Sequence, residues 1–129
     1  MKKLTQLFKA LSDESRLRIL NLIIEVGELC VCDIQRVLNF SQTKVSRHLA
    51  YLKYSAIVQD RREGAWMVYS LADKDDPISN ILFQELRDLF KNEPILQVDI
   101  TNLHESIKQG RCVSVCVLPV HEERELEKV

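Results

Sequence analysis

Residues 31–53 contain two short amphipathic segments separated by a turn, and this arrangement restricts the fold more than any other feature of the chain. Apolar residues recur at helical spacing in both segments, at Val31, Ile34, Val37 and Leu38 and then at Val45, Leu49 and Leu52. Asn39-Phe40-Ser41 supplies the turn, and the Ser41 hydroxyl is suited to cap a helix that begins at Gln42. The stretch therefore predicts a helix-turn-helix whose second helix runs from Gln42 to Lys53.

The segments on either side predict more helices and a hairpin. Helical spacing, bounded by capping residues, glycine or proline, predicts four further helices, over 4–11, from 12–15 to Gly27, from Pro77 to Phe90 and over 95–108. Pro94 should end or kink the third of these. Residues 57–61 and 65–71 are typical of two strands, joined at the turn residue Gly64. Together the elements predict a mainly α fold with a small β-hairpin, a winged helix-turn-helix.

The chain has 129 residues, enough for one core, and we expect one domain over 1–108 with a cysteine-containing tail over 109–129. No apolar run approaches the ~20 residues of a membrane helix, and the N-terminus lacks the apolar core of a signal peptide. These features predict a cytoplasmic protein without a membrane partner. In that compartment the four cysteines are expected to be free thiols or metal ligands.

The net charge is −1, but the positive charge is concentrated in the helix-turn-helix and the hairpin. Short polar and cationic side chains there suit base edges and phosphates, and the predicted DNA-binding residues are Ser41, Gln42, Thr43, Lys44, Ser46, Arg47, His48, Lys53, Arg61 and Arg62. Arg47 suits guanine, and Gln42 suits adenine or a phosphate. His48 faces either phosphate or the edge of the core. A single subunit would form only a small interface with DNA, so we expect a homodimer on double-stranded operator DNA. The first helix and the 78–90 helix are the candidate contacts between the two subunits.

Two thiols one residue apart, Cys30 and Cys32, stand directly before the helix-turn-helix. Thiolates select soft ions such as As(III), Sb(III), Cd(II) or Pb(II). On a regular helix, positions i and i+2 point roughly 200° apart. We therefore expect an ion that binds both sulfurs to unwind or bend the start of the first helix of the helix-turn-helix. This change would move the second helix, from Gln42 to Lys53, which we call the recognition helix.

Three motifs resemble the arsenic-repressor (ArsR/SmtB) family, in fixed order between Leu4 and Leu71. They are Glu28-Leu29-Cys30-Val31-Cys32-Asp33-Ile34, Ser41-Gln42-x-Lys44-Val45-Ser46-Arg47-His48-Leu49-Ala50-x-Leu52 and Arg61-Arg62-Glu63-Gly64-x-Trp66-x-x-Tyr69-x-Leu71. The resemblance implies a homodimeric repressor on the operator of its own operon, released by trivalent arsenic or antimony. It also implies that Cys30 and Cys32 bind the inducer and that no cofactor is required.

The resemblance is incomplete at the thiol site. Arsenic repressors with this motif often have a third cysteine where this chain has Gln35, and no cysteine precedes Cys30. The third ligand is then an exogenous thiol or water, or a thiolate from Cys112 or Cys116. As a helix, Cys112 and Cys116 would lie within about 5–6 Å; as a strand they would lie about 13 Å apart; as a flexible tail they could reach the first pair.

Other interpretations remain open. The same fold responds to Cd(II) or Pb(II) in related sensors, and a repressor could respond to thiol oxidation, although a C-x-C disulfide closes a small strained ring. A DNA-binding module that is independent of metal is a further alternative. A thiol-disulfide enzyme would need a substrate cleft and an accessible thiol of low pKa, and the sequence shows neither a thioredoxin-like strand-helix pattern nor a Gly-rich ligand loop. The spaced Asp/His zinc site of some relatives is not apparent, and we expect Asp99, His104 and Glu105 to be surface residues.

Overall fold

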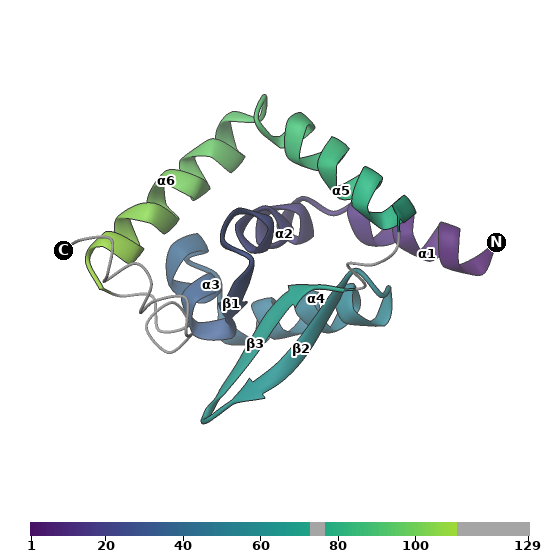
Figure 1. The fold of residues 1–129 in the computed structure, drawn as a ribbon. Coiled ribbons are helices and arrows are strands. Elements are labelled where there is room, and N and C mark those ends of the chain that lie inside the picture. The colour runs from purple at the N-terminus through teal and green to yellow at the C-terminus, as the bar shows by residue number, and fades with distance from the viewer. Residues whose placement is uncertain (73–76, 111–129) are drawn as a thin grey trace.

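A computed structural model describes residues 1–72 and 77–110, and this part of the chain forms six helices and one three-stranded sheet (Figure 1). The elements, in chain order, are α1 (Lys2–Leu11), α2 (Glu14–Val26), β1 (Glu28–Cys30), α3 (Val31–Leu38), α4 (Gln42–Tyr54), β2 (Val58–Glu63), β3 (Trp66–Leu71), α5 (Pro77–Phe90) and α6 (Pro94–Lys108). The predicted winged helix-turn-helix is confirmed, with α3 and α4 as the helix pair and β2 and β3 as the wing.

Capping residues set the helix boundaries that the sequence predicts. The Asp13 carboxylate accepts a hydrogen bond of 2.9 Å from the Arg16 backbone N–H at the start of α2. The Ser41 hydroxyl accepts one of 3.1 Å from the Lys44 backbone N–H at the start of α4. Asn39, in the left-handed conformation (φ 58°), ends α3 and lets the chain turn sharply into α4. The helix-turn-helix is therefore encoded locally, by two caps and one left-handed residue.

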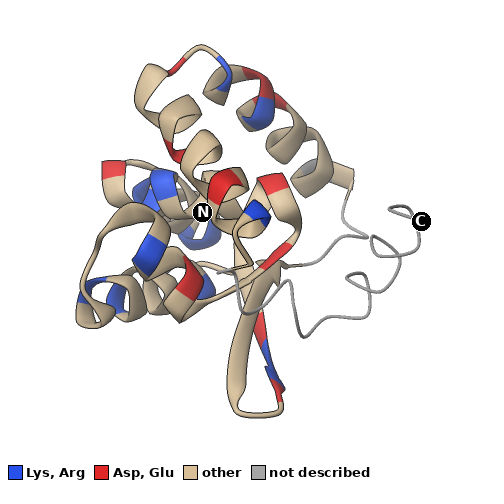
Figure 2. Ribbon diagram, turned by 90° about the vertical axis from the view of Figure 1, so that its left-hand side faces the viewer, with Lys and Arg blue, Asp and Glu red and all other residues tan. Residues whose placement is uncertain are grey.

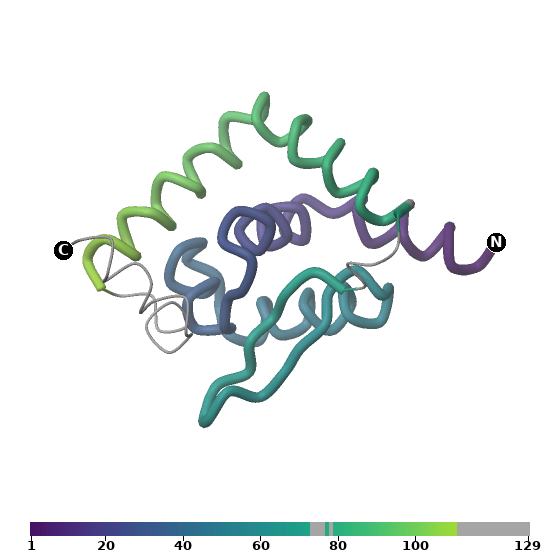
Figure 3. Tube along the Cα trace, viewed as in Figure 1, coloured from purple at the N-terminus to yellow at the C-terminus, as the bar shows by residue number. Residues whose placement is uncertain are grey.

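Helix α2 lies at the centre of the molecule, and the other elements pack around it. Figures 1 and 3 show α5 and α6 as two arms that meet at an angle and arch over α2, with α3, α4 and the sheet on its other side. The largest fully buried side chains are Ile19, Leu20, Leu22, Ile23, Leu29, Ile34, Leu49, Leu52, Ile57, Leu103, Val45 and Val58. One continuous core therefore holds the helix-turn-helix against α2.

The sheet has one more strand than the sequence predicted. The strands are antiparallel in the order β1-β3-β2, and Cys30 of β1 pairs with Val68 of β3, which pairs with Arg61 of β2. Strand β1 is only three residues long, too short to show the alternation by which strands are predicted. Because of this strand, the Cys30 thiol lies in the sheet, and its strand is paired with β3 of the wing.

Helix α5 ends at Phe90, before Pro94, as predicted, and Pro94 occupies the first turn of α6, where its missing N–H costs nothing. The expectation that Asp99 is a surface residue was wrong. Asp99 is 2% exposed, and its carboxylate accepts two hydrogen bonds, of 2.8 and 3.0 Å, from the Arg18 guanidinium of α2. His104 and Glu105 are exposed, as predicted, and His104 contacts Glu25 of α2 at 2.8 Å. Among the described helices, none combines the length and apolar character that crossing a membrane requires.

Candidate DNA-binding face and thiol site

The two sulfur atoms of Cys30 and Cys32 lie 3.0 Å apart at the junction of β1 and α3. Cys30 is the last residue of β1 and has an extended backbone (φ −92°, ψ 165°), whereas Cys32 lies in the first turn of α3. The expectation that the sulfurs would point about 200° apart was therefore wrong, because only one of the two residues is helical. The strand-to-helix corner turns both thiols toward each other without any unwinding of α3.

Burial governs the chemistry of this pair. Cys30 is 1% exposed and Cys32 is half-buried. Burial, and next the hydrogen bond with Cys32, raise the pKa of the Cys30 thiol to about 12. Cys30 is therefore a protonated thiol at neutral pH, and a thiophilic ion that binds it must displace its proton.

A carboxylate and a cavity adjoin the sulfurs. The Asp33 carboxylate lies within 4.8 Å of both ligand atoms, but it is fully buried and forms an ion pair of 3.1 Å with Arg36. A cavity of about 340 Å³ opens beside the thiols and is lined by Cys30, Val31, Cys32, Gln35, Gln42, Ala65, Trp66 and Met67. These residues come from the end of β1, from α3, from the first position of α4 and from the tip of the wing. The thiol site thus adjoins both parts of the predicted DNA-binding surface.

Helix α4 presents opposite faces to the core and to solvent. Val45, Leu49 and Leu52 are fully buried. The predicted contact residues that are exposed are Ser41, Gln42, Thr43, Ser46, Arg47, Lys53, Arg61 and Arg62. Lys44 is half-buried, with its Nζ 3.9 Å from the centre of the Phe40 ring in the turn. The arrangement leaves the N-terminal half of α4 free to enter a groove.

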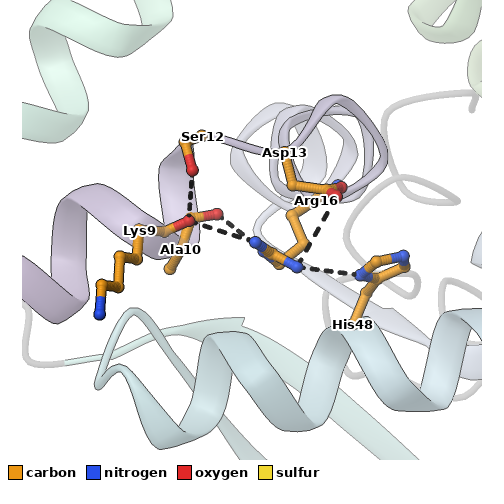
Figure 4. A network of polar contacts seen from close by, with 6 residues as sticks. All are labelled: Lys9, Ala10, Ser12, Asp13, Arg16 and His48. Atoms are coloured by element: carbon orange, nitrogen blue, oxygen red, sulfur yellow. Dashed lines mark hydrogen bonds and ion pairs between the residues drawn. The ribbon is translucent and has the colours of Figure 1, made fainter.

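His48 lies at the edge of the core, the second of its two predicted placements. It is 7% exposed, and Figure 4 shows its Nδ1 facing the Arg16 guanidinium, 3.4 Å away. Burial lowers the pKa of His48, so the imidazole is largely neutral at pH 7. This geometry favours a role in holding α4 against α2 over a contact with phosphate.

Arg16 is the polar residue at this junction that the sequence analysis missed. Its guanidinium donates to the carbonyl oxygens of Ala10, at 2.8 Å, and Lys9, at 3.2 Å (Figure 4). It also stacks 4.1 Å from the centre of the Tyr51 ring. One side chain thus joins the end of α1, the start of α2 and the recognition helix. Its partners lie up to 35 residues away in the chain, so no local pattern pointed to this role.

Two of the predicted phosphate-binding cations already have acidic partners. Lys53 of α4 contacts Asp60 of β2 at 3.0 Å. Arg61 of β2 contacts Glu28 of β1, and it also contacts Glu63 at 3.3 Å. Figure 2 accordingly shows blue and red residues side by side on the wing. The other two predicted sulfur ligands, Cys112 and Cys116, lie outside the described residues.

The sequence is similar to those of known bacterial regulatory proteins. Residues 13–60 match the family described as "Bacterial regulatory protein, arsR family". The arsenical resistance operon repressor of Bacillus subtilis is 32% identical over 93 residues, which cover 72% of this chain and 87% of that protein. The chain belongs to the arsR family.

Other family members are similar over a shorter segment. The arsenical resistance operon repressor of Escherichia coli is 54% identical over 67 residues, 52% of this chain and 57% of that protein. A cadmium resistance regulator, the CadC homolog of Staphylococcus aureus, is 42% identical over 69 residues, 54% of this chain and 57% of that protein. The matched segment thus spans little more than half the length of these two relatives.

A solved structure confirms the fold independently. The homodimeric winged helix-turn-helix DNA-binding domain Mb0332 of Mycobacterium bovis, a possible arsR-family regulator, superimposes with a TM-score of 0.61 at 29% identity, covering 71% of this chain and 82% of that one. The arsR-family match itself includes the thiol pair and α4 but ends at residue 60, before Arg61. Arg61, Arg62 and helix α6 therefore lie outside the segment that matches the family, and only the structure of this chain gives their positions.

Proposed function

We propose that this protein is a transcriptional repressor that binds operator DNA as a homodimer and leaves it when As(III) or Sb(III) binds the thiols of Cys30 and Cys32. The observation that carries the proposal is the approach of the two sulfurs to 3.0 Å, beside a cavity that Gln42 of the recognition helix also lines. Soft thiolate donors favour these ions over hard ones. Relatives named as arsenical resistance repressors support the choice of inducer.

In this proposal α4 enters the major groove and the wing lies on the backbone. The exposed side chains of Gln42, Thr43, Ser46 and Arg47 contact base edges or nearby phosphates, and Lys44, Lys53, Arg61 and Arg62 neutralise phosphates. With about five or six cations per subunit, the affinity for DNA should fall steeply as salt rises. His48 lies on the core side of α4 and holds this helix against α2.

A direct path leads from the thiols to the DNA-binding face. An ion that binds both sulfurs would displace the thiol protons and replace the contact between Cys30 and Cys32 with two ion–sulfur bonds, which would change the corner between β1 and α3. Helix α3 packs on α4, and Gln42 shares the wall of the cavity with both cysteines. An altered corner therefore displaces the start of α4, and DNA is released because the ion binds the displaced state better.

The third ligand is proposed to come from the tail, through Cys112 or Cys116. Helix α6 packs against α3, and Figure 1 shows its C-terminal half beside α3. Gly110 thus follows the end of α6 that lies beside α3, the helix to which Cys32 belongs. Cys112 and Cys116 lie two and six positions after Gly110 in the sequence, a reach of up to about 7 and 20 Å. An exogenous thiol or water is the alternative third ligand.

A Cd(II)- or Pb(II)-responsive repressor is the second candidate, and the similarity to a cadmium resistance regulator favours it. The two candidates share the fold and the thiol pair and differ in the ion and its coordination number. A titration with each ion separates them. Oxidation of the thiols, the third possibility, is tested by peroxide in place of the ion.

The proposal is tested by fluorescence anisotropy of a labelled duplex from the promoter of the gene, with the protein kept reduced and titrated with arsenite. We expect release of wild type, no release of the Cys30→Ser/Cys32→Ser variant, and a weaker response of Cys112→Ser/Cys116→Ser. Both variants should bind the duplex as wild type does without arsenite, which controls for folding. Equal release of wild type and Cys30→Ser/Cys32→Ser would contradict the assignment of the site.

A further inference from the structure

Arg61 and Glu28 contact each other across an intervening strand. Arg61 lies on β2 and Glu28 on β1, with β3 between them. The register places Arg61 opposite Val68, and Glu28 opposite Ser70, two residues further along β3. Directly paired residues project from the same face, as do alternate residues of a strand, so all four side chains share one face. Val68 and Ser70 are 1% and 7% exposed.

The ion pair is open to competition from outside. The Arg61 side chain is 43% exposed and that of Glu28 is 30% exposed. A guanidinium binds carboxylates and phosphates through the same N–H donors, so a phosphate at Arg61 competes with Glu28 for the Nη1 donors. Phosphate contact by Arg61 must therefore weaken its contact with Glu28.

Glu63 differs from Glu28 in its position, although it also contacts Arg61, at 3.3 Å. It lies two residues away on the same strand as Arg61. Glu28 belongs to β1, the strand that ends at Cys30 of the thiol site. Of the two acids, only Glu28 ties the wing cation to another element.

We propose that Glu28 competes with the DNA backbone for Arg61 and thereby limits the affinity of the protein for its operator. The inference rests on the proposed function, because it takes Arg61 to be a phosphate-binding residue. It adds a positioning residue that makes no DNA contact itself. It also places the competing acid two residues before Cys30, so the strand that ends at the thiol site sets how freely the wing cation reaches DNA.

The test is a double-mutant cycle on operator affinity, measured by anisotropy at fixed salt without arsenite. Glu28→Gln should bind the duplex about two- to fivefold more tightly than wild type, the range expected for release of a partly exposed ion pair. In the Arg61→Gln background, Glu28→Gln should change the logarithm of the affinity by less than about half as much as it does in the wild-type protein. Glu25→Gln removes the same charge from α2, where Glu25 contacts His104 of α6, and should leave the affinity unchanged.

Each outcome distinguishes the inference from the proposed function. An unchanged affinity of Glu28→Gln would overturn the inference, and so would an equal gain in the Arg61→Gln background, which would show only the general effect of removing a negative charge. If wild type binds operator DNA and arsenite releases it in either case, the proposed function stands. If wild type binds no operator DNA, the proposed function is overturned, and the inference with it.

Discussion

At the scale of single residues, Asp13 shows how one side chain fixes the start of α2. Its carboxylate accepts the Arg16 backbone N–H, and this hydrogen bond is the main cause that lowers the pKa of Asp13. Because the folded pKa is depressed, the ionised cap stabilises the protein above the unfolded pKa of about 3.9, and this stabilisation is lost as the pH falls through the lower folded value.

We predict that Asp13→Ala lowers the free energy of unfolding by about 1 kcal/mol at pH 7. The loss should shrink as the pH is lowered toward 2 and the wild-type carboxyl becomes protonated. Urea unfolding at both pH values measures it. Asp13→Asn is the matched control, since its amide oxygen still caps the helix but does not titrate. A loss that is the same at pH 7 and at pH 2 would contradict the role of the ionised cap.

Residue patterns predicted what is encoded locally and missed what is encoded at long range. The caps at Asp13 and Ser41 and the turn at Asn39 act within four residues, so the helix-turn-helix could be predicted. The contact between Arg18 and Asp99 spans 81 residues, and no signal near either one indicates the other. The thiol geometry was missed for a different reason: the strand that turns Cys30 toward Cys32 is three residues long.

At the scale of elements, α6 is fastened to α2 by two acid–base contacts of different character. Arg18 and Asp99 have side chains 20% and 3% exposed and form two hydrogen bonds. Glu25 and His104 are 39% and 55% exposed. The Arg18 guanidinium also lies 5.1 Å from the centre of the Phe40 ring, on which Lys44 of the recognition helix stacks. The buried contact therefore links α6 to the turn of the helix-turn-helix.

We predict that Asp99→Asn lowers the free energy of unfolding by about 2 kcal/mol, because charged hydrogen bonds are lost and Arg18 retains a partly buried charge. Glu25→Gln removes the exposed contact between the same two helices and should cost less than about 1 kcal/mol. Chemical unfolding of both variants at pH 7 makes the comparison. Equal losses would show that burial does not separate the two contacts.

At the scale of the whole molecule, apolar side chains remain exposed where the proposed dimer needs them. Leu4 and Phe8 of α1 are 51% and 58% exposed, and Ile81 and Leu89 of α5 are 65% and 61% exposed. Soluble monomers seldom leave several large apolar side chains on neighbouring helices uncovered. In the proposed function, a dimer formed through these helices would present two recognition helices to the DNA.

We predict that Phe8→Glu shifts the protein from dimer to monomer, because a carboxylate buried in an apolar interface is strongly unfavourable. Val98→Glu is the matched control: Val98 is 56% exposed, nearly as much as Phe8, but lies on α6, outside the proposed interface. Sedimentation velocity over a range of concentrations should give a monomer for the first variant and a dimer for the second. The monomer should also lose most of its affinity for a two-site duplex while keeping weak binding to a single half-site. If Val98→Glu dissociates and Phe8→Glu does not, the dimer forms through α6 instead, and the exposed apolar side chains of α1 do not belong to the dimer interface.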